Sequence, residues 1–469
     1  MDTNPIIEFT NFTFQYYSQA EPTLHDINLK IFTGQKILIV GPSGSGKSTL
    51  GHCLNGLIPF SYKGEIHGSL KINGQETSTL DIFKLSKTIG TVLQDSDAQF
   101  VGLTVGEDIA FALENDNIPT DEMHERVRSV AKMVDIHNWL TSSPFELSGG
   151  QKQRTSLAGV MIDDVDILLF DEPLANLDPA TGKTAIEIID DIHKQSGKTI
   201  LIIEHRLEDV LHRDVDRVIV VDNGRIIADM DAHALVASDI LLETGIREPL
   251  YVTALKYAGV QVTEAMQAGH IETLKKELTQ DALQIWYRHI QPTRYLDTRL
   301  SILKMEDISF SYDGLRPVLE DINIDIKEGE MVSIVGKNGA GKSTLSKLLC
   351  GFEKEDRGRI LYRGEDIRTK SIKERAEIIG LVMQNPNQMI SKPLIFDEVA
   401  LGLRLRQVPE DEITARVEKV LKVCGLAPFI DWPISALSYG QKKRVTIASI
   451  LVLDPRILIL DEPTAGQDF

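Results

Sequence analysis

The sequence has 469 residues, 42% of them hydrophobic, with 50 basic and 69 acidic residues and a formal net charge of -19 at pH 7. A chain of this length can bury more than one core. Its acidic balance argues against sequence-independent binding to nucleic acid or to an anionic lipid surface.

Targeting segments and cysteine chemistry are not predicted. The N-terminal residues show no basic region followed by an apolar stretch, so we expect no secretory signal. The most apolar runs, at 37–40, 167–170 and 457–460, are of strand length and fall short of the roughly 18 residues of a transmembrane helix. Neither a disulfide framework nor a zinc site is predicted for the widely separated Cys53, Cys350 and Cys424.

The first half opens with a β-rich segment at 6–16, and a later apolar strand at 36–40 leads into the pattern G-x-x-x-x-G-K-S. Glycines let backbone N–H groups turn toward an anion, and the N-terminus of the following helix adds partial positive charge. Lys47 can reach the terminal phosphates of a nucleotide, and Ser48 can bind Mg²⁺. The spacing therefore predicts a phosphate-binding loop at 41–49.

Residues 105–145 are helical in pattern, and an apolar strand then ends at Asp171 and Glu172. A carboxylate at this strand end can reach Mg²⁺ beside the nucleotide. Glu172, one residue further on, is well placed to orient and deprotonate an attacking water. The alternative is two acids entering a loop, which Pro173 would explain by itself; beside a phosphate-binding loop we favour the catalytic interpretation.

The chain then repeats itself after a connector of mixed charge, which we expect to form helices and turns. In the second half an apolar strand is predicted at 331–335 before a second phosphate-binding loop, helices at 395–435, and a strand ending at Asp461 and Glu462. Chance similarity would not preserve this order and spacing. GKNGAGKSTL at 336–345 repeats GPSGSGKSTL at 41–50, LSYGQKKR at 437–444 repeats LSGGQKQR at 147–154, and ILILDEP at 457–463 repeats ILLFDEP at 167–173.

The repeat also fixes the register of the two halves. Ser148 and Ser438 are 290 residues apart, as are Asp171 and Asp461, whereas Lys47 and Lys342 are 295 apart. The first half therefore carries five more residues between its phosphate-binding loop and Gln94.

The segment LSGGQ at 147–151, with the phosphate-binding loop, the Asp-Glu pair and Gln94, resembles the ATPase domain of ABC transporters, and the resemblance covers nearly the whole chain except the connector. It implies an α/β fold of two tandem P-loop ATPase domains. Each would have a mixed or parallel core sheet, an antiparallel β subdomain and a helical subdomain. The Ser-Gly-Gly segment would begin a helix whose N-terminus covers the γ-phosphate bound by the opposite domain. A plain helix N-cap would explain Ser148 but not both glycines.

The same resemblance implies further roles. Gln94 and Gln384 would contact Mg²⁺ or the attacking water and report the nucleotide state to the transporter, and His205 would hold the γ-phosphate. Adenine would stack on an aromatic residue of each unit, Tyr16 and Tyr312. Asp178 and Asp468 would lie in loops that cross the interface between the two ATPase domains.

The predicted site residues fall into three groups, with ATP and Mg²⁺ as the cofactors. The catalytic residues are Glu172, Glu462, His205, Gln94 and Gln384. The magnesium ligands are Ser48, Gln94, Asp171, Ser343, Gln384 and Asp461. The nucleotide-binding residues are Gly41, Pro42, Ser43, Gly44, Ser45, Gly46, Lys47, Ser48, Thr49, Gly336, Lys337, Asn338, Gly339, Ala340, Gly341, Lys342, Ser343, Thr344, Tyr16, Tyr312, Ser148, Gly149, Gly150, Gln151, Ser438, Gly440 and Gln441.

Two departures from the family pattern predict that the ATP sites differ. Tyr439 replaces the first glycine of the second signature, and the second unit has no counterpart of His205. The family pairs its domains head to tail, so the Tyr439 signature would complete the site at Lys47, and the complete signature would serve the site at Lys342. We therefore expect unequal hydrolysis at the two sites.

Several segments resemble the energy-coupling-factor importers, which take up vitamins and transition-metal ions. They are LQDSDAQFVGLTVGEDIAFAL at 93–113, VMQNPNQMISKPLIFDEVALGL at 382–403, IIEHRLEDV at 202–210, and LSYGQKKR with TAGQD in the second unit. This resemblance implies a peripheral protein at the cytoplasmic face of the cell membrane, with a membrane coupling protein and a substrate-binding membrane subunit as partners. It does not identify the transported substrate. The alternative is a soluble tandem ABC ATPase acting on ribosomes; a long basic connector, typical of that class, is absent here. A sugar or peptide importer with fused ATPases is a second transport alternative.

The predicted domains are a first ATPase domain at 1–245, a helical connector at 246–300 and a second ATPase domain at 301–469. The first unit continues well past Asp178, whereas the sequence ends one residue after Asp468. We therefore expect the second domain to be incomplete at its C-terminus.

Overall fold

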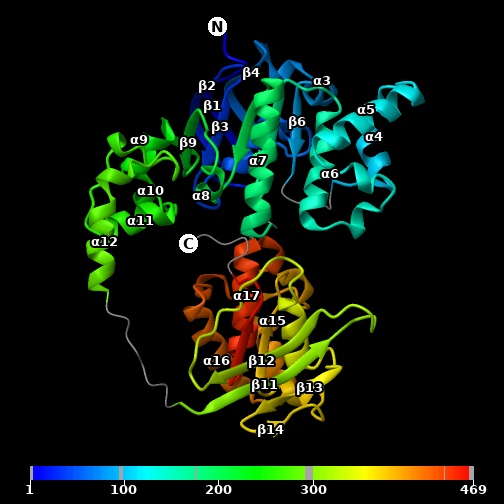
Figure 1. The fold of residues 1–469 in the computed structure, drawn as a ribbon, viewed down its shortest axis with the longest axis vertical. Coiled ribbons are helices and arrows are strands. Elements are labelled where there is room, and N and C mark those ends of the chain that lie inside the picture. Colours follow the sequence, from blue (N-terminus) through cyan, green and yellow to red (C-terminus); the bar gives the residue numbers. More distant parts are fainter. Residues whose placement is uncertain (1–3, 94–98, 175–176, 291–298, 438, 464–469) are drawn as a thin grey trace. The chain divides into compact units, whose positions relative to one another are not determined.

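A computed structural model describes residues 4–93, 99–174, 177–290, 299–437 and 439–463. The chain forms two compact units, one over residues 1–292 and the other over residues 293–468. They are called the first unit and the second unit. Figure 1 draws the elements of both.

The first unit contains two sheets. One is antiparallel, with the strand order β2-β1-β4-β5, and the other is a six-stranded core sheet with the order β10-β9-β3-β8-β7-β6. The strands of the core sheet from β9 to β6 are parallel, and β10 is antiparallel to β9. The strands are β1 (Ile7–Tyr16), β2 (Leu24–Ile31), β3 (Lys36–Val40), β4 (Gly64–Ile72), β5 (Gln75–Glu76), β6 (Ile89–Val92), β7 (Ile167–Asp171), β8 (Thr199–Ile203), β9 (Arg217–Asp222) and β10 (Arg225–Met230).

Strand β3 shows why the core sheet is apolar on both faces. Every residue of β3 is buried, and β8 and β9 flank the strand on its two sides. Successive side chains of a strand point to opposite faces. Accordingly, Ile37 and Ile39 pack with the antiparallel sheet and α1, whereas Leu38 and Val40 pack with α6 and α7. The continuous apolar run KILIV is thus the pattern of a parallel strand covered on both faces.

Helices cover the core sheet and form a separate group beside it. Figure 1 shows α7 lying across the sheet, α4, α5 and α6 gathered beside β6, and α9, α10 and α11 beside β9. Local capping explains where some of them begin: Thr104 and Glu107 form a capping box at α4. The helices of the first unit are α1 (Lys47–Leu54), α2 (Leu57–Phe60), α3 (Ile82–Ser86), α4 (Val105–Asn115), α5 (Thr120–Met133), α6 (Gly149–Met161), α7 (Pro179–Ser196), α8 (Leu207–Val210), α9 (Ala232–Ala237), α10 (Ile240–Glu243), α11 (Leu250–Tyr257) and α12 (Gln280–His289).

The connector region forms helices and packs onto the first unit. Val252 and Leu255 of α11 are fully buried in the same hydrophobic core as α6 and α7. The ring Nε2 of the buried His270 lies 2.7 Å from the carbonyl oxygen of His212. The described part of 246–292 therefore shares a core with the ATPase elements that precede it.

The second unit repeats the antiparallel sheet, with the order β12-β11-β13-β14, and has a two-stranded parallel sheet of β15 and β16. Its helices α15, α16 and α17 enclose a core of their own. The elements are β11 (Ser301–Phe310), β12 (Leu319–Lys327), α13 (Lys342–Cys350), β13 (Arg357–Tyr362), β14 (Glu365–Asp366), α14 (Ile372–Ala376), β15 (Ile379–Val382), α15 (Ile395–Leu405), α16 (Glu410–Val423), α17 (Tyr439–Leu451) and β16 (Ile457–Leu460).

The predicted strand at 331–335 is wrong for this structure, because that segment is irregular. Its apolar side chains are exposed, with Met331 98% and Val335 85% accessible. In the first unit the corresponding strand β3 is held between β8 and β9. Among the described residues of the second unit, no strand pairs with this segment on either side.

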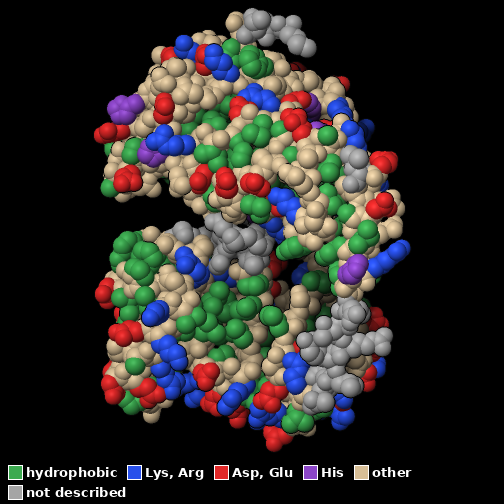
Figure 2. All heavy atoms as spheres, turned by 90° about the vertical axis from the view of Figure 1, so that its left-hand side faces the viewer, with side chains coloured by type: hydrophobic (Ala, Val, Ile, Leu, Met, Phe, Trp, Pro, Cys, Tyr) green, Lys and Arg blue, Asp and Glu red, His purple; other side chains and the backbone are tan. Residues whose placement is uncertain are grey.

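The surface carries both signs of charge. On the face drawn in Figure 2, acidic and basic side chains are interspersed among hydrophobic ones rather than gathered by sign. Such mixing is the usual pattern of a solvated protein surface.

Candidate ATP sites

The first phosphate-binding loop lies between β3 and α1 and contains the predicted residues 41–46. Gly41 has to be glycine, because a Cβ there would lie 2.1 Å from the carbonyl oxygen of Val221. Gly46 precedes α1 with a φ of 103°, in the left-handed region that favours glycine. The buried Lys47 donates from Nζ to the carbonyl oxygens of Gly41 and Pro42, both at 2.8 Å. The loop is thus curled around its own lysine, at the N-terminus of a helix.

The structure brings two predicted magnesium ligands of the first unit together. Ser48 Oγ lies 3.5 Å from Asp171 Oδ1. Burial raises the pKa of the Asp171 carboxyl to about 6, and the neighbouring charge of Glu172 adds to the effect. A hydroxyl and a carboxylate oxygen are hard ligands of the kind that Mg²⁺ prefers. These residues therefore fit a divalent cation beside the phosphate-binding loop.

The predicted base Glu172 directly follows β7 and has a φ of 50°. Its counterpart Glu462 has a φ of 45°. Both predicted bases therefore adopt the left-handed backbone conformation, which residues other than glycine rarely adopt. The Glu172 amide donates to the carbonyl oxygen of Ile203 in β8 at 2.8 Å. This bond fixes the base at the edge where the parallel strands end.

His205 lies beside Glu172 and is held by a second glutamate. Its Nδ1 is 4.0 Å from Glu172 Oε2 and 3.1 Å from Glu204 Oε1. Glu204 is fully buried, accepts from the backbone amides of His205 and Leu174, and has a pKa raised by burial. Glu204 was not predicted as a site residue, although an acid between an apolar strand and His205 indicates one. Glu204 orients the loop that carries His205.

In the second unit, two predicted catalytic residues form a hydrogen bond with each other. Gln384 Nε2 donates to Glu462 Oε2 at 2.6 Å. Lys342 Nζ donates to the carbonyl oxygens of Gly336 and Lys337 at 2.9 and 3.0 Å, which repeats the geometry of Lys47. The loop at 336–340 is exposed, in keeping with the irregular segment before it.

The two predicted adenine platforms are built alike. Tyr16 Oη lies 3.2 Å from Thr49 Oγ1, and Tyr312 Oη lies 3.3 Å from Thr344 Oγ1. Each tyrosine ring also contacts, edge to face, the phenylalanine two residues before it, with centroids 4.7 Å apart in the first unit and 4.9 Å in the second. Each tyrosine is thereby tied to the helix that follows its phosphate-binding loop.

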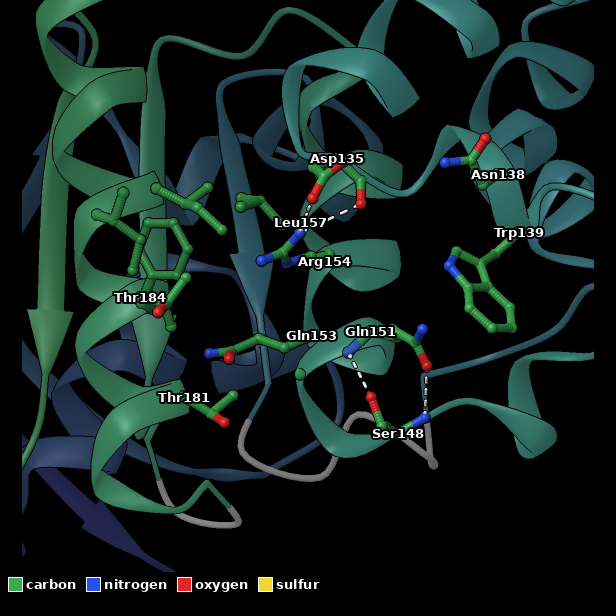
Figure 3. A pocket seen from close by; sticks show the side chains of 15 residues that line it. Asp135, Asn138, Trp139, Ser148, Gln151, Gln153, Arg154, Leu157, Thr181 and Thr184 are labelled. Carbon is green, nitrogen blue, oxygen red and sulfur yellow. Dashed lines mark hydrogen bonds and ion pairs between the residues drawn. The ribbon is translucent and has the colours of Figure 1, made fainter. Parts of the chain in front are cut away.

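The first signature segment begins α6, as predicted. Ser148 accepts from the Gln151 amide at 3.4 Å, and its own amide donates to Gln151 Oε1 at 2.9 Å, which forms a capping box. A Cβ on Gly150 would lie 2.8 Å from Thr181 Cγ2, so this glycine allows α6 to approach α7 closely. Ser148, Gln151 and Thr181 line a cavity with a volume of about 360 Å³, and Figure 3 shows their side chains around it. The other residues that line the cavity are Asp135, Asn138, Trp139, Gly150, Gln153, Arg154, Leu157, Phe170, Thr184, Ala185, Ile188 and Ile189.

Asp178 has a defined structural role in the first unit. It is the N-cap of α7, and its carboxylate accepts from the backbone amides of Ala180 and Thr181. Its predicted place in an interface loop stays a prediction. Gln94, Ser438 and Asp468 lie outside the described residues, and Tyr439 is the first residue of α17.

One residue of the second site was missed from the sequence. Lys443 of α17 has no exposed surface, and its Nζ donates to the carbonyl oxygens of Met383 and Gln384 at 2.8 Å and of Asp461 at 3.3 Å. Burial lowers the pKa of its ammonium group. In the first unit the corresponding residue is Gln153, which donates to the carbonyl oxygen of Pro173. The sequence showed this difference only as the change from Gln153 in QKQR to Lys443 in QKKR.

Comparison with known proteins identifies the class. The family model of ABC transporters matches residues 24–175 and 319–465, and a model described as ATP-binding cassette cobalt transporter matches residues 238–310. The chain is 58% identical to an ABC transporter ATP-binding protein of Clostridium perfringens, over all of this chain and 83% of that protein. It is 56% identical to one of Photobacterium profundum, over 99% of this chain and 82% of the relative.

A solved structure is similar as well: cbiO1 from Clostridium perfringens, described as part of the ABC transporter complex cbiONQ. It is 28% identical, with a TM-score of 0.47, over 54% of this chain and 99% of that one.

The fold and the sequence matches define a tandem P-loop ATPase with an α/β fold, as predicted. The chain belongs to the ABC transporter family as an ATP-binding protein. The predicted function, the ATP-hydrolysing energy-coupling subunit of an ABC importer of energy-coupling-factor type, is confirmed by the family matches, which do not support the ribosomal alternative. The cobalt-transporter match spans the connector, for which no function of its own was predicted.

Proposed function

We propose that the two units bind two MgATP molecules head to tail, so that the signature of each unit completes the site of the other. The observation that carries this proposal is the duplication of one geometry: in each unit a lysine is folded over its own loop carbonyls, ready to exchange them for phosphate oxygens. In this arrangement the Tyr439 signature would serve the site at Lys47.

Magnesium fits the residues that end β7 and begin α1. Ser48 and Asp171 in the first unit, and Ser343 and Asp461 in the second, would hold it with nucleotide oxygens and water as further ligands. The bound ion would neutralise charge on the β- and γ-phosphates. Gln94 and Gln384 would contribute their amide oxygens.

The protein's own residues would carry the proton and hold the phosphate. Glu172 and Glu462 would orient a water and accept its proton as it attacks the γ-phosphorus. His205, held by Glu204, would donate a hydrogen bond to the γ-phosphate. Lys47 and Lys342 would bind terminal phosphate oxygens as point charges. Closure around two nucleotides and opening after hydrolysis would supply motion to the transporter.

Movement of the substrate across the membrane would be carried out by other chains. Among the described residues, no helix has the length and hydrophobicity that crossing a bilayer requires. We propose that the protein sits at the cytoplasmic face of the membrane, bound to an integral coupling protein near Gln94 and Gln384, with a separate membrane subunit that selects the substrate. We propose a metal ion, a vitamin or a vitamin precursor as cargo, and the match of the connector to a cobalt-transporter family supports the metal ion.

Affinity purification of the tagged protein from detergent-solubilised membranes tests this proposal. We expect small hydrophobic integral proteins to co-purify in fixed ratio, because the energy-coupling role requires a stable docking surface. A parallel purification from the membrane-free fraction is the control. Recovery of ribosomal subunits in place of integral proteins would contradict the importer.

A further inference from the structure

The five extra residues of the first unit lie in one segment, beside the predicted adenine platform. Gly56 follows α1 and Gly351 follows α13, with φ values of 78° and 79°, and the next glycines of this conformation are Gly68 and Gly358, with 83° and 93°. Because these glycines correspond in conformation and position, the insertion falls within the segment 57–67, which corresponds to only 352–357 in the second unit.

The inserted segment holds Tyr62 in a fixed place. The amide of Tyr62 donates to the carbonyl oxygen of Leu57 at 2.8 Å. Strand β4 then begins at Gly64, directly opposite Tyr16 in β1, and a Cβ on Gly64 would lie 2.6 Å from the ring of Phe14. Backbone bonds on one side and a close strand contact on the other thus fix the short stretch that carries Tyr62.

Tyr62 completes an aromatic cluster around Tyr16. Its ring meets that of Tyr16 edge to face with centroids 6.3 Å apart, and it stacks on the imidazole of His52 at 5.0 Å with an interplanar angle of 20°. Burial lowers the pKa of His52, which favours the uncharged ring. Despite these two contacts, Tyr62 remains 45% exposed. An exposed aromatic ring supported from behind is a stacking surface.

The second unit has a different neighbour at this place. Residue 347 corresponds to His52 and is a lysine, whose Nζ lies 5.8 Å from the centroid of the Tyr312 ring. The shorter segment 352–357 carries no aromatic side chain that contacts Tyr312 among the described residues. Tyr312 is therefore paired with a cation where Tyr16 is paired with a second aromatic ring.

We propose that Tyr62 is a second aromatic contact for the purine base of ATP at the first site, so that this site recognises the base more strongly than the second site does. The inference rests on the proposed function, since it takes Tyr16 as the adenine platform. Aromatic side chains bind bases through their π faces and add affinity that does not depend on the phosphates. Tyr62 would thus contribute to base binding only, and Lys47 to phosphate binding.

The test separates the contribution of the base to ATP binding from the contribution of the phosphates. In the full chain carrying Lys342→Ala, which leaves the first loop intact, Kd is measured by calorimetry for ATP and for inorganic tripolyphosphate. We expect Tyr62→Leu to raise the Kd of ATP about tenfold, as for the loss of one base–aromatic contact, and to leave the Kd of tripolyphosphate unchanged. Tyr62→Phe should retain ATP binding, because the ring is kept.

Phe60→Leu is the matched control, because Phe60 lies in the same inserted segment and is also 45% exposed; it should leave both constants unchanged. An unchanged Kd of ATP in Tyr62→Leu would overturn the inference. So would an equal loss for ATP and tripolyphosphate, which would mean that Tyr62 only supports the fold of the loop. If the unsubstituted chain binds neither ligand, the proposed function itself fails, and this inference with it.

Discussion

Replacing both Glu172 and Glu462 by glutamine is expected to abolish ATP turnover while ATP binding persists. Glutamine keeps the size of the side chain but cannot accept the proton of the attacking water. A positioned general base contributes about 10²- to 10⁴-fold to a rate, so turnover should fall at least about 100-fold. Steady-state phosphate release measures the loss, and equilibrium titration with ATP shows whether binding is retained.

The single substitutions should not have equal effects. Glu172 lies 4.0 Å from the ring of His205, whereas Glu462 accepts a hydrogen bond from Gln384 at 2.6 Å. The proposed head-to-tail pairing also gives the first site the Tyr439 signature. Equal losses of rate in Glu172→Gln and Glu462→Gln would count against two distinct sites, and full turnover in the double variant would exclude both glutamates as bases.

The second large effect is expected for Lys443→Met. Methionine has a similar length, but it cannot donate to the carbonyl oxygens of Met383, Gln384 and Asp461. Leaving a buried acceptor without its donor costs about 1–3 kcal/mol. We expect the segments that carry Gln384 and Asp461 to lose their fixed position, and turnover to fall about tenfold or more, since both sites share one cycle of closure in the proposed function.

Lys442→Met is the matched control for this prediction. Lys442 is the adjacent lysine of α17, is partly exposed, and carries the same charge. It should leave turnover unchanged. Thermal unfolding of each variant separates a local effect from a general loss of stability. The role of Lys443 as a positioning residue would be contradicted if Lys443→Met kept full turnover, or if Lys443→Gln, which copies the first unit, were no better than Lys443→Met.

The local parts of both sites could be predicted from the sequence because the phosphate-binding loop, its lysine and the acids at the strand end are fixed by short-range spacing. Lys47, Ser48 and Asp171 accordingly lie where strand, loop and helix place them. Lys342 begins α13 directly after its loop, although the segment before that loop is irregular. The hydrogen bond between Gln384 and Glu462 joins residues 78 positions apart, and the resemblance to ABC transporter ATPases implied that both belong to one site.

The features that could not be predicted from the sequence depend on residues that lie far away along the chain. The apolar segment 331–335 has the composition of a strand, but a strand requires neighbours, and the first unit supplies them from β8 and β9. Lys443 could not be recognised because only the fold shows which carbonyl oxygens its long side chain reaches. Tyr62 was hidden for a similar reason: the count of five extra residues was evident, but not their place beside Tyr16.

The most direct measurement is a calorimetric titration with MgATP. It compares the unsubstituted chain with the variant that carries both Lys47→Ala and Lys342→Ala, under identical conditions. We expect the unsubstituted chain to bind nucleotide at both loops and the double variant to lose that binding, with its fold retained by circular dichroism. Equal affinity in the two proteins, or no binding by the unsubstituted chain, would contradict the account.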